Sequence, residues 1–181
     1  MGAVVAHPHP LLGGDMGNAI VAEMTKALFG CGISTLRFNF RGVGESTGIF
    51  DDGRGEQDDI RAALSFMEEQ GIREILPAGY SFGAWVTAAI LKRARLLPAL
   101  FVSPPLALFP FDVESMRGRT GLIVCGGLDP YCPVEVVKNF AARLTCGVEI
   151  IPGADHFFQA REDQLAACIT DFARRVLKPQ M

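Results

Sequence analysis

The sequence has no long apolar stretch and no strong charge of either sign. Its apolar residues never run uninterrupted for the roughly 18 positions that a membrane-spanning helix needs, so we expect no membrane segment. Lysine and arginine number 17 against 20 aspartates and glutamates, which gives a formal net charge of −3. This near balance gives no reason to expect nucleic acid or an anionic membrane as a partner.

The chain also lacks the features of a secreted protein. No basic segment followed by a long apolar one stands near its first residue, as a secretory signal would require. The five cysteines are an odd number and are scattered through apolar surroundings. We therefore expect reduced cysteines in a cytoplasmic protein.

What is present is sufficient for one well-packed domain. At 181 residues, of which 49% are apolar, the chain can bury a full hydrophobic core. It has no internal repeat and no low-complexity tract. We predict a single domain over residues 1–181.

Short apolar segments alternate with segments of helical periodicity. The strands are predicted at Ala3–Ala6, Ile33–Phe40, Glu74–Ala78, Ala99–Ser103, Gly121–Gly126 and Gly147–Ile151. The helices are predicted at Asn18–Phe29, Glu56–Gln70, Ala84–Leu96, Pro133–Leu144 and about Ala160–Leu177. Continuously apolar strands indicate a parallel sheet covered on both faces. The fold class is therefore α/β, a doubly wound sheet of about six mainly parallel strands, with a local distortion expected where Pro77 lies in a central strand.

One stretch carries a chemical signature. Gly79-Tyr80-Ser81-Phe82-Gly83 follows an apolar strand and precedes a helix of small and apolar residues. This is the G-x-S-x-G pattern, in which a serine sits on a strained strand-to-helix turn with its hydroxyl exposed. Ser81 is thus a candidate nucleophile.

A serine hydroxyl needs a base to take its proton and a third group to orient that base. Of the three histidines, only His156 lies beyond Ser81, in the segment that follows the last predicted strand. Asp129 follows the strand before it, and the order Ser, Asp, His on strand-end loops is the order of the α/β-hydrolase triad. Asp155 is the rival acid, but it stands next to His156 and is too close in sequence to bond easily to that imidazole.

With these residues in place, the chain resembles the small, lid-less α/β hydrolases, close to the dienelactone-hydrolase-like and prolyl-oligopeptidase-like serine hydrolases. The matching segments are His7-Pro8-His9-Pro10 with Gly13-Gly14, Phe38–Ser46, Gly79–Gly83, Asp129 and His156-Phe157-Phe158, and they extend over essentially the whole chain.

The resemblance implies a catalytic triad of Ser81, Asp129 and His156. It also implies an oxyanion hole made by the backbone N–H of Phe82 and one amide of the loop after the first strand. Pro8 and Pro10 have no N–H, which leaves Leu11 or His9. We expect Leu11.

The sequence departs from this family's pattern in two places. Members usually begin with an antiparallel hairpin, which here is either absent or truncated, so a sheet edge is left that a partner subunit could cover. We expect a monomer or a homodimer. The connection Pro104–Thr120 is too short for the cap domain that commonly lies there, and we expect an open site.

Other interpretations of single features are weaker. His7-x-His9 resembles a metal-binding pair of histidines. The position of both residues in the predicted oxyanion loop accounts for them without a metal, and no set of carboxylates and histidines follows that could complete a metal site. Gly42-x-Gly44 lacks the third glycine of a dinucleotide site. We expect no metal and no cofactor. The sequence does not decide whether four phenylalanines line an acyl pocket or pack in the core: Phe109, Phe111, Phe157 and Phe158.

The functional prediction is a serine hydrolase that cleaves a small or medium acyl ester or thioester. Its only expected partner is that small-molecule acyl substrate. The alternatives are a peptidase of short peptides and an inactive scaffold of the same fold that binds a ligand or a partner.

Overall fold

A computed structural model of the chain describes residues 1–93 and 95–177. One sheet of six parallel strands has the order β2-β1-β3-β4-β5-β6. The strands are β1 (Gly2–Ala6), β2 (Ser34–Arg37), β3 (Ile75–Tyr80), β4 (Ala99–Val102), β5 (Thr120–Gly126) and β6 (Gly147–Ile151). The predicted doubly wound α/β sheet is confirmed.

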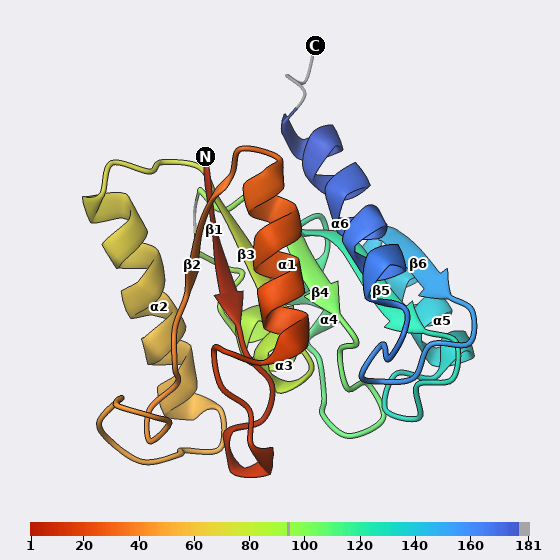
Figure 1. Cartoon of the computed structure of the whole chain (residues 1–181), viewed down its shortest axis with the longest axis horizontal. Coiled ribbons are helices and arrows are strands. Elements are labelled where there is room, and N and C mark those ends of the chain that lie inside the picture. The colour runs from red at the N-terminus through yellow and green to blue at the C-terminus, as the bar shows by residue number, and fades with distance from the viewer. Residues whose placement is uncertain (94, 178–181) are drawn as a thin grey trace.

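Helices cover both faces of the sheet (Figure 1). They are α1 (Ala19–Gly30), α2 (Arg54–Glu69), α3 (Phe82–Ala89), α4 (Val113–Met116), α5 (Val134–Leu144) and α6 (Glu162–Leu177), with a 3₁₀ turn η1 (Pro10–Leu12) before α1. Helices α1 and α6 lie side by side on one face, and the other four lie on the opposite face. None of the helices in the described ranges has the length and apolarity to cross a bilayer.

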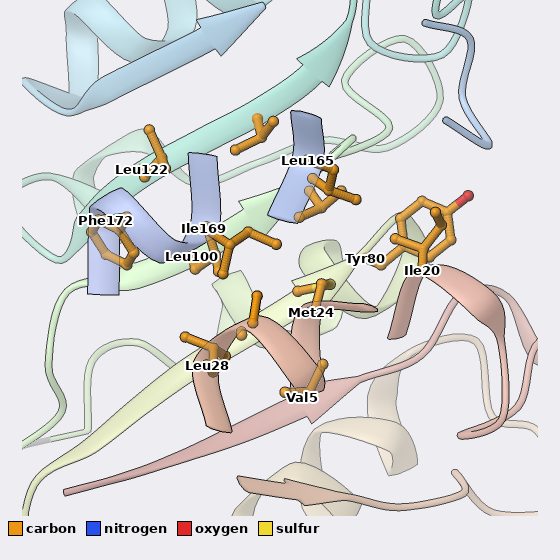
Figure 2. Close-up of a cluster of buried hydrophobic side chains, with 14 of the residues drawn as sticks. Val5, Ile20, Met24, Leu28, Tyr80, Leu100, Leu122, Leu165, Ile169 and Phe172 are labelled. Carbon is orange, nitrogen blue, oxygen red and sulfur yellow. The ribbon is translucent and has the colours of Figure 1, made fainter. Parts of the chain in front are cut away.

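The face under α1 and α6 holds the largest single cluster of buried apolar residues, part of which is drawn in Figure 2. Apolar residues three or four positions apart on each helix meet alternate residues of the strands, because a helix presents one stripe and a strand one side. The buried residues labelled there are Val5, Ile20, Met24, Leu28, Tyr80, Leu100, Leu122, Leu165, Ile169 and Phe172. Two further clusters fill the opposite face, one under α2 and α3 and the other under α3, α4 and α5.

Two elements are shorter than their sequence patterns predict. The strand predicted at Ile33–Phe40 is regular only over Ser34–Arg37, because β2 is an edge strand and its pairing with β1 ends at Val5↔Arg37. The helix predicted at Ala84–Leu96 ends at Ala89. Residue 94 of that prediction lies outside the described residues.

Pro77 occupies an irregular part of the sheet, as predicted. Toward β1 it is in register with Val4, but the ladder toward β4 begins only at Ala78↔Leu100. Before that ladder, a single bridge pairs Ile75 with Leu96. Between the two pairings the chain advances by three residues on β3 (75 to 78) but by four on the segment that leads into β4 (96 to 100). Regular pairing on this side of β3 is therefore interrupted at Pro77, which has no N–H to donate.

His7 ties the end of β1 to the segment after β2. Its ring is buried, Nε2 accepts the backbone N–H of Phe40 at 3.0 Å, and Nδ1 lies 2.7 Å from the carbonyl oxygen of Pro8. Because Nε2 must accept, Nδ1 carries the proton and donates to Pro8. Burial lowers the pKa of His7, although the bond to Pro8 and the charge of Asp15 oppose this.

The buried His7 is expected to make folding sensitive to mild acid. At a pH well above its ordinary value of 6.5 the ring is neutral in both the folded and the unfolded chain. As the pH falls below that value the unfolded chain takes up the proton first, so stability is lost. His7→Gln, whose side-chain oxygen can still accept from Phe40, should flatten the pH dependence between about pH 7 and pH 5, by at most about 1.4 kcal/mol per pH unit.

The measurement is urea unfolding of both proteins across this pH range. Equal slopes for His7→Gln and the wild type would contradict the assignment of the acid sensitivity to His7.

Candidate active site

The loops that follow the strands gather at one end of the sheet, at the lower side of Figure 1. Ser81 stands at the centre of this end, between β3 and α3. Its backbone has φ 54° and ψ −121°, a conformation that a non-glycine residue rarely adopts. The half-buried side chain faces a cleft rather than the core.

Two glycines allow the turn to be this tight. A Cβ on Gly79 would overlap the carbonyl of Gly83, at the start of α3. A Cβ on Gly83 would overlap the carbonyls of Ala6 and His7, at the end of β1. The backbone of α3 therefore packs directly against both neighbouring strand ends, which is why the pattern needs glycine on each side of Ser81.

The structure brings Ser81, His156 and Asp129 together in the predicted order. Nε2 of His156 lies 3.0 Å from Oγ of Ser81, and Nδ1 of His156 lies 2.8 Å from Oδ2 of Asp129. The rival acid, Asp155, does not bond to this ring; its Oδ1 accepts the backbone N–H of Phe157 at 2.9 Å.

The Asp129 carboxylate is buried and well bonded. Oδ1 accepts the backbone N–H groups of Tyr131 at 2.9 Å and Cys132 at 3.1 Å, while Oδ2 faces His156. Burial alone would raise the pKa of Asp129, but the hydrogen bond and the charge of His156, with the amide of Tyr131, outweigh it and lower the pKa. The group therefore stays ionised beside the imidazole.

Tyr80 has a role that its place in the G-x-S-x-G pattern does not indicate. Its side chain is buried, and its hydroxyl donates to the backbone carbonyl of His156 at 3.0 Å. Burial, and then the charges of Asp129 and Asp155, raise the pKa of Tyr80, so the hydroxyl keeps its proton as a donor. The residue before the nucleophile thus anchors the loop that carries the histidine.

Aromatic rings surround the His156 imidazole. The ring of Tyr131 lies 4.9 Å away at 82°, and the ring of Phe157 lies 5.5 Å away at 88°. Both are edge-on contacts, which aromatic pairs favour.

A mainly apolar cleft of about 290 Å³ opens over Ser81. It is lined by Pro8, His9, Leu12, Gly13, Gly14, Asn18, Tyr80, Ser81, Phe82, Pro105, Leu108, Phe109, Tyr131, His156 and Phe157. The connection between β4 and β5 holds only the one-turn helix α4 and forms no cap over it.

Of the four phenylalanines left open by the sequence, two line this cleft and two do not. Phe109 and Phe157 contribute to its wall. Phe158 is buried in the core under α1 and α6, and Phe111 packs against Phe140 of α5.

Leu11 does not lie where its predicted role requires. Its backbone N–H donates to Nδ1 of His9 at 3.2 Å, and it is not among the residues that line the cleft. His9, the alternative in the same loop, lines the cleft, and no hydrogen bond from its backbone N–H is found within the described residues. The geometry favours the His9 amide over that of Leu11.

The two histidines of the first loop are both engaged with protein atoms. The two ring nitrogens of His7 face Pro8 and Phe40, and Nδ1 of His9 accepts from Leu11. Burial lowers the pKa of His9, against the charges of Glu56 and Asp52, which agrees with a neutral ring that accepts at Nδ1.

Comparison with known proteins identifies relatives over most of the chain, although no protein-family model matches it. An α/β serine hydrolase homologue from Coxiella burnetii is 36% identical with a TM-score of 0.86, over 94% of this chain and 84% of that one. A lid-less α/β serine hydrolase from Xanthomonas campestris is 30% identical with a TM-score of 0.89, over 99% of this chain and 83% of that one.

A curated but uncharacterised protein of Rickettsia prowazekii is 35% identical over 94% of this chain and 77% of its own length. The sheet order, the absence of a cap between β4 and β5, and these identities agree. The chain belongs to the α/β serine hydrolases and is one of their small members without a lid.

Proposed function

We propose that the protein is a serine esterase or thioesterase that acts on small or medium acyl groups. The observation that supports this is the chain of hydrogen bonds from Ser81 through His156 to the buried Asp129, at the floor of an apolar cleft. The apolar lining suits an uncharged acyl group.

In the proposed reaction, Nε2 of His156 takes the Ser81 proton as Oγ bonds to the substrate carbonyl carbon. The proton then passes to the leaving oxygen or sulfur as its bond to that carbon breaks, and an acyl-serine remains. Water repeats the sequence: it gives its proton to His156 and bonds to the acyl carbon. Ser81 then leaves with that proton. Asp129 keeps the imidazole in the required tautomer.

The developing negative charge on the carbonyl oxygen needs fixed donors. The N–H of Phe82, at the first residue of α3, is one, and we assign the second to the N–H of His9. Each such donor is worth about 3 kcal/mol of transition-state stabilisation.

The other two candidate functions have less support. An inactive scaffold would be favoured by a buried Ser81 or by a missing bond to His156, and neither is observed. No feature of the cleft selects a peptide over an ester.

Ser81→Ala should remove the nucleophile. Turnover of p-nitrophenyl acetate is expected to fall by at least about 10⁴-fold, and labelling by a fluorophosphonate probe should disappear. A thermal melt of the variant serves as the control for folding. Labelling that persists in Ser81→Ala would contradict the assignment of Ser81 as the nucleophile.

Asp129→Asn and Asp155→Asn form a matched pair that separates the two candidate acids. An amide at 129 would stabilise the wrong tautomer of His156, and we expect kcat to fall by about 10⁴-fold. An amide oxygen at 155 can still accept from Phe157, so that variant should stay within a few-fold of the wild type. Equal losses in steady-state kinetics of the two variants would contradict the assignment.

The assignment of the His9 amide can be tested by proline substitution. His9 has φ −57°, close to the value that proline imposes, so His9→Pro removes the N–H at little conformational cost. Compared with His9→Ala, which removes the ring and keeps the N–H, His9→Pro should lower kcat a further 10²- to 10³-fold, approximately. Equal kcat values for the two variants would exclude this amide.

A further inference from the structure

The position of the leaving group follows from the position of His156. Nε2 lies 3.0 Å from Oγ of Ser81, and the same nitrogen must return the proton to the leaving oxygen. The leaving oxygen therefore lies within hydrogen-bonding distance of Nε2, and the first carbons of the departing alcohol lie beside the imidazole. This geometric step rests on the proposed function.

Two aromatic side chains from separate loops stand at that place. Tyr131, in the loop between β5 and α5, and Phe157, in the loop between β6 and α6, both line the cleft and both contact the imidazole edge-on. The two loops are joined by a hydrogen bond from the N–H of Leu128 to the carbonyl of Ala154, at 2.9 Å. This bond holds together the backbones of the two loops that carry the rings.

These rings remain accessible to a ligand. Tyr131 is 40% exposed and Phe157 is 58% exposed, so each has free surface that an apolar group can cover. No lysine, arginine, aspartate or glutamate is among the described residues that line the cleft. An uncharged, apolar leaving group fits this surface, whereas a charged one would find no partner.

The aromatic residues on the oxyanion side form a different group. The ring centroid of Phe82 lies 4.7 Å from that of His9 and 6.2 Å from that of Phe109. Phe109 in turn stacks on Trp85, with 4.5 Å between the ring centroids. These rings make no ring contact with His156 within the described residues. They are therefore distinct from Tyr131 and Phe157, which both contact the imidazole.

We propose that Tyr131 and Phe157 form a leaving-group subsite that selects esters of bulky apolar alcohols, with arylmethyl alcohols such as benzyl alcohol as the preferred class. The preference arises from the apolar area that the departing alcohol covers and from its aromatic edge contacts with the two rings.

Benzyl butyrate and ethyl butyrate test the subsite directly. Both release a primary alcohol of similar acidity and form the same butyryl-serine, so their deacylation is identical. The ratio of their kcat/KM values therefore measures how strongly the enzyme stabilises the acylation transition state of one alcohol relative to the other. We expect the wild type to favour benzyl butyrate by about tenfold, because the benzyl ring covers more apolar surface than an ethyl group and can pack against both aromatic side chains.

Phe157→Ala is the central variant, and the exposure of Phe157 allows the change without loss of the core. The benzyl-to-ethyl ratio of kcat/KM should fall about fivefold, because benzyl butyrate loses a ring contact that ethyl butyrate does not make. Phe157→Tyr should restore the ratio, and Tyr131→Ala should lower it as Phe157→Ala does. Leu108→Ala is the matched control: Leu108 lines the same cleft and is 60% exposed, but it should leave the ratio unchanged.

The results that would contradict the subsite differ from the result that would contradict the proposed function. A wild-type ratio near one, or an equal loss on both esters in Phe157→Ala, would overturn the subsite; the equal loss would mean that Phe157 only positions His156. A fall in the ratio with Leu108→Ala as large as with Phe157→Ala would overturn it as well. If no ester is hydrolysed and Ser81 is not labelled by a fluorophosphonate, the proposed function fails, and the subsite fails with it.

Discussion

The close approach of α3 to the ends of β1 and β3 is the constraint on which the rest of the site depends. Because Gly79 and Gly83 carry no Cβ, three backbones meet at the floor of the cleft, and Ser81 is held at a positive φ. The buried packing of Phe82 and Val86 against the sheet compensates for that strain. The hydroxyl is thus presented from rigid elements, and the amide of Phe82 is aligned by the same turn.

Much of the fold could be predicted because parallel strands leave a simple pattern. The four inner strands are buried on both faces and continuously apolar, and these four and β6 are predicted to within about two residues of their observed bounds. The prediction for the edge strand β2 is too long, since Phe38 and Phe40 have β propensity but no partner strand beyond Arg37. The order Ser81, Asp129, His156 could be predicted because each residue lies in the loop after a strand, and the ends of these strands lie at the same edge of the sheet.

Other features depend on contacts that local patterns do not encode. Which amide of the first loop faces the cleft, that of Leu11 or that of His9, depends on a hydrogen bond inside the loop: the N–H of Leu11 donates to Nδ1 of His9. The role of His7 depends on Phe40, which is distant in the sequence and adjacent only in the folded sheet. The placement of Phe158 in the core and Phe157 in the cleft follows from the course of the chain after β6, and both are phenylalanine in the sequence.

The hydrogen bond from Tyr80 to the carbonyl of His156 has a mechanical consequence. The nucleophile and the base come from strands separated by β4 and β5, so a change in sheet twist would ordinarily alter the distance between them. Tyr80 is the immediate neighbour of Ser81 and holds the histidine loop from the same strand end. This hydrogen bond therefore limits how far the backbone of His156 can move away from the end of β3, where Ser81 lies, when the sheet twists.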